Sequence, residues 1–197
     1  GTGPLVLMLH GFDSCHLEFR RLAPLLIADH SLVIPDLYGF GFSPRHPGAN
    51  EGPEAVMIHL AALLANLPQD QPIGVIGASM GGAVAMELAR RHRTRINRLL
   101  LLSPAGLDGK PMPVPPLLDQ LGVWFLGRPE VRRGLCRQAF ADPDASVGPA
   151  ELEIASLPLQ VPGWGPSLAA FARSGGFAAC GPPLPSQTLQ VLWGNQD

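Results

Sequence analysis

The stretch GASMGGA, residues 77–83, decides the fold. It joins an apolar run at 72–77, which predicts a buried strand, to a helical pattern that begins at residue 80. A serine placed between glycines at such a junction has two interpretations. Ser79 is either the capping residue of a glycine-rich turn, or a nucleophile held on a sharp turn above the carboxyl end of a sheet.

The glycines around Ser79 bear on this choice. Gly77-Ala78-Ser79-Met80-Gly81 fits the pattern G-x-S-x-G, in which a Cβ on either glycine would clash with neighbouring backbone. The pattern is short and recurs by chance, so alone it favours the capped turn. A phosphate-binding loop is a third alternative, but the stretch lacks the required glycine spacing and a nearby lysine. The sequence context therefore has to decide.

The first half of the chain alternates short apolar runs with helical patterns. We predict strands at 4–9, 30–36, 72–77 and 96–106, and helices at 16–30, 54–67 and 80–93. The helix at 16–30 is expected to bury a face formed by Phe19, Leu22, Leu25 and Leu26. This order predicts an α/β fold with a doubly wound parallel sheet and helices on both faces.

The alternation stops after residue 105. Residues 106–185 are rich in proline and contain amphipathic helical segments at 117–127, 129–140, 150–159 and 167–180, without a clear strand. A further strand follows at 186–194. We therefore predict an α/β core at 1–105 and 186–197 with a helical cap inserted at 106–185. Both ends of the chain are expected to cut through the sheet, which leaves a core incomplete at both ends, with open edges and low stability.

Composition and charge exclude several classes of function. The formal net charge is −2, which gives no electrostatic reason to expect nucleic acid or an anionic membrane surface as partner. No apolar run is long enough to span a membrane. Cys15, Cys136 and Cys180 lack a metal-ligand spacing and are expected to be reduced, buried thiols of a cytoplasmic protein. No metal and no cofactor is expected, and the oligomeric state is left open.

A second motif follows the first strand. His10-Gly11-Phe12 lies where acyl-transfer enzymes of this architecture place a donor of the oxyanion hole. We predict that the backbone N–H groups of Phe12 and Met80 face the oxyanion of a tetrahedral intermediate. His10 is expected to bond to local backbone and not to act as the catalytic base.

Five motifs occur in a consistent order along the chain: LMLHGF at 7–12, PDLYGFGFS at 35–43, GASMGG at 77–82, LLLLSPAG at 99–106 and VLWGNQD at 191–197. Together they resemble the α/β-hydrolase fold superfamily, in its cap-bearing serine hydrolase branch. The resemblance implies a triad in which Ser79 is the nucleophile and Asp197 orients a histidine. Asp108 is a weaker candidate for the acid, and Asp36 is expected to stabilise its own loop.

The histidine of that triad departs from the pattern. The chain contains His10, His16, His30, His46, His59 and His92, and only His92 follows Ser79. It lies at the far end of the helix that begins after Ser79, away from the proposed site. The resemblance thus implies that the chain is a fragment, inactive alone, whose histidine lies in a segment beyond residue 197. An inactive homologue is the alternative.

The function expected from these residues is hydrolysis of an ester or related acyl bond in a small, apolar substrate. A serine nucleophile argues against epoxide hydrolases and dehalogenases, which use an aspartate there. Carbon–carbon bond hydrolase, aminopeptidase, lipase, thioesterase and cofactor-free haloperoxidase activities stay open, as does a non-catalytic ligand-binding receptor. The cap aromatics are Trp124, Phe125, Trp164, Phe171 and Phe177, and their helical spacing favours a core role over lining an acyl pocket.

Overall fold

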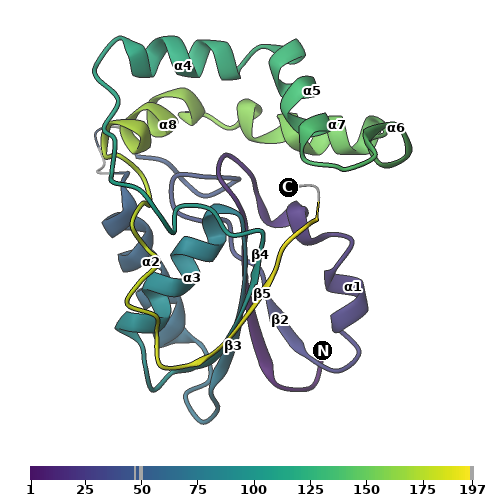
Figure 1. Cartoon of the computed structure of the whole chain (residues 1–197), viewed down its shortest axis with the longest axis vertical. Coiled ribbons are helices and arrows are strands. Elements are labelled where there is room, and N and C mark those ends of the chain that lie inside the picture. The colour runs from purple at the N-terminus through teal and green to yellow at the C-terminus, as the bar shows by residue number, and fades with distance from the viewer. Residues whose placement is uncertain (47, 49–50, 196–197) are drawn as a thin grey trace.

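The structure, a computed structural model of the chain, describes residues 1–46, 48 and 51–195. Its centre is a single parallel sheet of five strands, in the order β2-β1-β3-β4-β5 (Figure 1). The strands are β1 Leu5–Leu9, β2 Ser31–Val33, β3 Ile73–Ala78, β4 Ile96–Leu102 and β5 Thr188–Leu192. The prediction of an α/β fold with a doubly wound parallel sheet is confirmed.

The strand order creates a switch point between β1 and β3. From β1 the chain crosses to β2 on one side and then returns to β3 on the other side. Leu9 pairs with Gly77, so the segments that leave the carboxyl ends of these two strands start next to each other. Open α/β sheets bind ligands at this kind of position.

Helices cover both faces of the sheet, as predicted. On one face lie α2 Pro53–Asn66 and α3 Met80–Arg91, and on the other lie the 3-10 helix η1 His16–Phe19 and α1 Ala23–Leu26. The first face holds the larger core, which includes Leu7, Leu9, Val56, Leu60, Val75, Val84, Leu88 and Leu101. The second core contains Met8, Phe19 and Ile76, with Leu22 and Leu26 packed against them.

The single helix predicted at 16–30 is wrong. This segment forms η1 and the four-residue helix α1 instead. Pro24 explains the break, because a proline has no N–H to donate and its ring clashes with the carbonyl group four residues earlier. Of the predicted apolar face, Phe19, Leu22 and Leu26 pack into the core, whereas Leu25 is exposed.

A layer of helices lies above the carboxyl ends of the strands, at the top of Figure 1. It consists of α4 Leu118–Leu126, α5 Pro129–Gln138, α6 Pro143–Ser146, α7 Pro149–Ser156, the 3-10 helix η2 Leu157–Gln160 and α8 Trp164–Arg173. The helix predicted at 150–159 ends earlier, at Ser156. Pro158 lies in the following 3-10 helix η2 and interrupts the α-helix. The helix predicted at 167–180 ends at Arg173, and Gly175 and Gly176 follow with φ of 83° and 63°. The described residues between 106 and 185 contain no strand.

The strand β5 forms one edge of the sheet. It corresponds to the strand predicted at 186–194 and pairs with β4, and the side chains of Val191 and Leu192 are exposed. On the face covered by η1 and α1, a groove of about 380 Å³ lies over β3, β4 and β5 and is lined by Ile76, Leu100 and Gln190, among others. None of the helices in the described part of the chain is long and apolar enough to cross a membrane.

The packing of α2 predicts a contrast between two of its residues. Leu60 is fully buried in the larger core, whereas Ile58 on the same helix is 64% exposed. Leu60→Ala should lower the free energy of unfolding by about 2–5 kcal/mol, because the lost contacts leave a cavity. Ile58→Ala should change it by about 0.5 kcal/mol or less. Urea unfolding followed by circular dichroism measures both, and equal losses would show that α2 does not pack on the sheet through Leu60.

Candidate active site

Ser79 occupies a sharp turn between β3 and α3. Its backbone has φ 51° and ψ −121°, a conformation that L-residues rarely adopt. Such a conformation costs about 1–3 kcal/mol and persists only where the surroundings hold it. The surroundings here are backbone: a Cβ on Gly77 would overlap the carbonyl of Gly81, and one on Gly81 would overlap the carbonyl of Leu9. The turn can therefore approach the neighbouring strand only because both flanking positions are glycine.

Hydrogen bonds fix the backbone of Ser79 and leave its side chain free. The Ser79 N–H donates to the Leu102 carbonyl (3.0 Å), and the Ser79 carbonyl accepts from the N–H groups of Gly82 and Ala105 (both 2.9 Å). The hydroxyl makes no capping bond to the helix, and the residue is exposed. Within the described part of the chain, the Ser79 side chain is thus not used for capping.

His10 is buried at the end of β1. Its Nε2 accepts the Leu37 N–H (3.0 Å), so its Nδ1 carries the proton and donates to the Gly11 carbonyl (2.8 Å). Burial lowers the pKa of His10 to about 4. A neutral ring with both nitrogens engaged in backbone bonds holds two loops together and is poorly suited to accept a proton from Ser79.

Gly11 lies directly against the turn at Ser79. A Cβ on Gly11 would stand 3.2 Å from Cβ of Ser79 and 3.4 Å from Oε2 of Glu18. The Gly11 N–H donates to this Glu18 oxygen (2.9 Å), and burial raises the pKa of the Glu18 carboxyl. The next N–H along the loop, that of Phe12, and the N–H of Met80 donate no hydrogen bond to any described residue. Phe12 follows Gly11, which lies against Ser79, and Met80 follows Ser79 itself in the chain.

A cavity of about 570 Å³ lies above Ser79. The core side contributes Gly11, Phe12, Asp13, Ser14, Glu18, Arg20 and Ser79, and the helical layer contributes Leu126, Arg132, Leu135, Cys136, Ala139, Phe140, Glu151, Ile154 and Ala155. Its volume is that of a pocket for a small molecule. The cavity thus lies between the strand ends and the helical layer, with Ser79 in its wall.

Charged pairs tie the helical layer to the core at this cavity. Asp13 forms a buried ion pair with Arg132 of α5 and accepts a bond from Nε1 of Trp164 in α8 (2.8 Å). Burial raises the pKa of Asp13, and Arg132 opposes that shift. On the far wall, Glu151 of α7 pairs with Arg20 and with Arg21 (2.6 Å to the latter). Removing one partner of a buried pair leaves an unpaired charge, so these contacts help to hold the layer in place.

Aromatic side chains make a third connection between the two layers. Phe12 and Phe40 from the core lie 6.0 Å and 4.9 Å from Phe171 of α8, measured between ring centroids. Phe171 in turn contacts Phe177. Of the five cap aromatics, Phe171 is therefore core, as its spacing favoured, whereas Trp124 and Phe125 are exposed, and a core role for them is wrong. The aromatics that line the cavity are Phe12 and Phe140.

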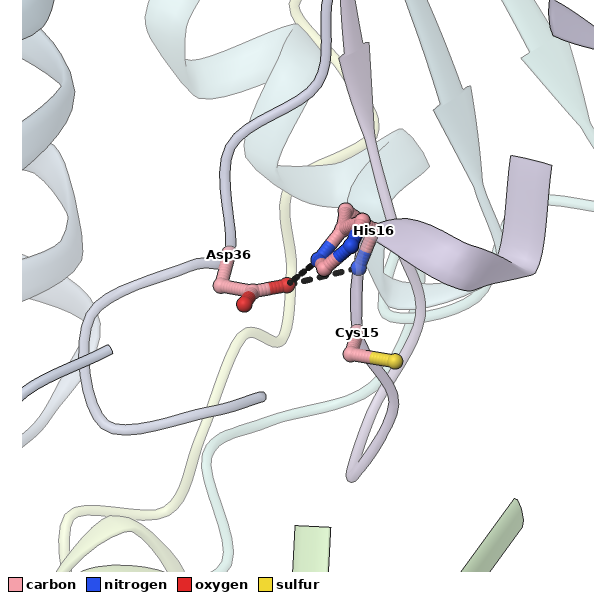
Figure 2. A group of neighbouring side chains, drawn as sticks. All are labelled: Cys15, His16 and Asp36. Carbon is pink, nitrogen blue, oxygen red and sulfur yellow. Dashed lines mark hydrogen bonds and ion pairs between the residues drawn. The ribbon is translucent and has the colours of Figure 1, made fainter. Parts of the chain in front are cut away.

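Asp36 fastens the loop after β2 to the loop after β1 (Figure 2). Its Oδ1 accepts from the backbone N–H of His16 (2.6 Å) and from Nδ1 of His16 (3.0 Å), and its Oδ2 accepts from the N–H of Phe42 (2.9 Å). Asp36 therefore stabilises its own loop, as predicted. Cys15 lies beside this pair, and the three residues bring potential metal-ligand atoms within 4.8 Å of one another. Because the carboxylate is engaged in these bonds and burial raises the pKa of the Cys15 thiol, we interpret the cluster as a loop fastening.

Three further residues were considered for the site. Asp197 lies outside the described residues. Asp108 is exposed in the loop after β4. His92 ends α3, which is about 18 Å long, so it lies far from Ser79. The three cysteines are free, but Cys136 is only half-buried, so the expectation that all three are buried is wrong.

Sequence reasoning missed the charged wall of the cavity. Asp13 and Arg132 are separated by 119 positions and Arg20 and Glu151 by 131, so no local spacing relates them. The one usable signal is position: Asp13 and Glu18 lie within seven residues of Gly11, in the loop already assigned to the site. That signal could have suggested site residues but not their partners.

Comparisons with known proteins agree with this geometry. The sequence profile described as alpha/beta hydrolase fold matches residues 4–164. The chain is 38% identical over 176 residues to Lipase LipV of Mycobacterium tuberculosis, covering 86% of this chain and 65% of that protein. It is 33% identical over 111 residues to 2-hydroxy-6-oxo-2,4-heptadienoate hydrolase of Pseudomonas putida, covering 55% and 40%. The chain thus spans less than two thirds of the length of either relative.

A solved structure shows the same fold. A meta-cleavage product hydrolase from Pseudomonas fluorescens superposes with a TM-score of 0.79, covering 98% of this chain and 73% of that chain, at 20% identity. At this level of identity the similarity concerns the fold alone.

The close approach at Gly81 predicts a strong steric effect. In Gly81→Ala the new Cβ meets the Leu9 carbonyl, and the turn has to move, so the free energy of unfolding should fall by about 2 kcal/mol or more. Gly134→Ala is the matched control: a Cβ there has nothing within 4 Å, and Gly134 lies inside α5. The control should be more stable by up to about 1 kcal/mol. Similar stabilities for the two variants in thermal melts would contradict the described turn.

The environment of His10 predicts a pH dependence of stability. Its pKa falls from 6.5 to about 4 on folding, so between these values the unfolded state binds a proton that the folded state does not. The free energy of unfolding should therefore decrease as the pH falls from 6.5 towards 4, by about 3 kcal/mol in all from this group. In His10→Gln, whose carbonyl can still accept from Leu37, this slope should be missing. Parallel urea titrations across this range measure the difference, and identical slopes would refute the role given to His10.

Proposed function

This chain belongs to the alpha/beta hydrolase fold family, and from that premise we propose that it carries the nucleophile of a serine hydrolase. The relatives named above are hydrolases. The bond proposed for cleavage is an ester or a related acyl bond. The main support for the proposal is the conformation of Ser79. Its backbone is held in a strained turn, its hydroxyl makes no capping hydrogen bond to the helix, and the residue lies in the wall of a cavity.

The strain at Ser79 fits a nucleophile better than a structural serine. The hydroxyl of a capping serine accepts a hydrogen bond from a helix N–H group, and such a serine does not need a positive φ. Here the turn presents the hydroxyl at the amino end of α3, where the free N–H groups and the helix dipole favour developing negative charge. The energetic cost of this backbone conformation is therefore explained if the Ser79 side chain must project into the cavity.

We assign the oxyanion hole to the backbone N–H groups of Phe12 and Met80. Met80 follows Ser79 in the chain, and Phe12 follows Gly11, which lies against Ser79. Neither N–H group has a protein acceptor among the described residues. One such donor contributes about 3 kcal/mol to stabilisation of the transition state. His10 supports this arrangement, because its Nδ1 donates to the Gly11 carbonyl, which belongs to the same peptide as the Phe12 N–H. Glu18 holds the preceding peptide through the Gly11 N–H.

The proposed reaction uses a base that the described part of the chain does not bring to Ser79. The Ser79 hydroxyl attacks the acyl carbon, a histidine takes its proton, and the oxyanion rests on the two N–H groups. The histidine then protonates the leaving group, and water releases the acyl group by the same steps in reverse. We propose that this histidine lies outside residues 1–197 and that Asp197 orients it, with Asp108 as the weaker candidate.

The helical layer is proposed to act as a cap over the substrate. Residues 106–185 supply more than half of the cavity lining, so they determine which substrates fit. The apolar part of the lining includes Leu126, Leu135, Phe140 and Ile154, which suits a small apolar acyl group. The charged residues of the same cavity are engaged in ion pairs with one another, except Glu18, which binds the Gly11 N–H.

A second candidate is hydrolysis of a carbon–carbon bond. The match to 2-hydroxy-6-oxo-2,4-heptadienoate hydrolase favours it. A non-catalytic receptor of the same fold is the third candidate, since no histidine of the described residues is hydrogen-bonded to Ser79.

Labelling with a fluorophosphonate tests the nucleophile. The whole protein, including any segment that follows Asp197, should form a stoichiometric adduct, and Ser79→Ala should abolish it. Ser14→Ala is the matched control, because Ser14 lines the same cavity and should leave labelling unchanged. Residues 1–197 alone should be labelled far more slowly, since a serine without a base is a weak nucleophile. An unlabelled but folded whole protein would favour the receptor, and labelling that persists in Ser79→Ala would refute the assignment.

A further inference from the structure

The lining of the cavity between the strand ends and the helical layer contains one carboxylate, that of Glu18, without a counter-ion among the described residues. The two arginines of the same lining are already paired, Arg20 with Glu151 and Arg132 with Asp13. A ligand that enters this cavity therefore meets a carboxylate whose charge no described side chain balances.

Two neutral donors stabilise the Glu18 carboxylate. The Gly11 N–H donates to its Oε2 (2.9 Å), and the Ser14 hydroxyl donates a second hydrogen bond. Burial raises the pKa of the Glu18 carboxyl more than these two bonds lower it, and no charged side chain of the described part contributes to the shift. A carboxylate in such surroundings favours a positively charged partner, because an opposite charge within about 4–6 Å stabilises its ionised form.

The carboxylate lies close to the atoms that are proposed to react. A Cβ placed on Gly11 would stand 3.2 Å from Cβ of Ser79 and 3.4 Å from Oε2 of Glu18, so a single methyl group there would contact both residues. The Gly11 N–H that Glu18 holds also directly precedes the Phe12 N–H proposed for the oxyanion hole. A cation paired with Glu18 would therefore lie near an acyl carbon bonded to Ser79.

An unpaired carboxylate at this place works against the proposed reaction of an uncharged substrate. The oxyanion of a tetrahedral intermediate is negative, and like charges repel each other strongly in a partly buried site. A substrate with a positive charge beside its acyl bond removes this repulsion by pairing with Glu18. The aromatic rings of Phe12 and Phe140 line the same cavity, and aromatic faces also attract cations.

We propose that the Glu18 carboxylate binds an ammonium group of the substrate, beside the acyl bond that Ser79 attacks. The substrate class is then an ester or a related acyl compound that carries a positively charged amine near its acyl carbon. In this role Glu18 contacts the substrate but forms no covalent bond and transfers no proton. The inference rests on the proposed function, since it takes Ser79 as the nucleophile.

Matched pairs of p-nitrophenyl esters test the proposal. In each pair the acyl chain ends in a trimethylammonium group or in the isosteric tert-butyl group, with one to three methylene groups before the carbonyl. A quaternary amine keeps its charge at every pH and cannot attack the ester. For at least one chain length, the whole protein should hydrolyse the cationic ester with a kcat/KM about tenfold or more above that of its neutral partner, because a close charge pair is gained.

Glu18→Gln separates recognition of the charge from support of the loop. The glutamine carbonyl can still accept the Gly11 N–H but carries no charge. The kcat/KM of the cationic ester should fall about tenfold, whereas that of the neutral ester should not fall, because the repulsion of the oxyanion is lost. A purely structural role would lower both values. Glu153→Gln is the matched control: Glu153 is exposed on α7 and does not line the cavity, so the ratio should stay unchanged.

Binding without turnover separates failure of this inference from failure of the proposed function. In Ser79→Ala, titration calorimetry should show tighter binding of the cationic than of the neutral amide of the same acyl group, and adding Glu18→Gln should remove the difference. If the esters are hydrolysed, equal kcat/KM values within every pair, or a preference that survives Glu18→Gln, would overturn the role of Glu18 and leave the hydrolase intact. If no ester is hydrolysed and Ser79 is not labelled, the hydrolase fails, and equal binding of the two amides would overturn the cation site as well.

Discussion

The close approach of the turn at Ser79 to the end of β1 is the constraint on which the rest of the structure depends. Gly81 lies against the Leu9 carbonyl, and Gly11 lies against Ser79 itself. These contacts need both glycines and need β1 and β3 to be neighbours with Leu9 opposite Gly77. Because that pairing exists only at the switch point of the sheet, the strand order and the site are parts of one arrangement.

The helical layer depends on the same loop. Phe12 and Asp13 directly follow Gly11, and they make the aromatic and ionic contacts to Phe171, Trp164 and Arg132. The peptides proposed to bind an oxyanion and the side chains that contact the helical layer are thus adjacent in sequence. A substitution in this loop should therefore affect both the reacting atoms and the shape of the cavity above them.

Local sequence predicted the parts of the fold that local physics determines. The parallel sheet, α2, α3 and the turn at Ser79 follow from apolar runs, glycine spacing and helix signals that lie within a few residues. The prediction of one helix at 16–30 was wrong because it followed the helical periodicity of the apolar residues and gave too little weight to Pro24, which breaks the helix. The buried pair of Asp13 and Arg132 could not be foreseen, since it depends on how the helical layer sits on the sheet. The exposure of Trp124 and Phe125 could not be foreseen for the same reason, because periodicity alone does not say which side of α4 packs against another element.

We propose that Ser79 is held so that the oxygen of an acyl group bonded to it lies between two backbone N–H groups. The most direct test is a crystal structure of the whole protein after reaction with a phosphonate. We expect a covalent bond from Oγ of Ser79 to phosphorus, with the phosphonyl oxygen about 3 Å from the N–H groups of both Phe12 and Met80. A phosphonate bonded elsewhere, or one on Ser79 whose oxygen points away from both groups, would contradict it.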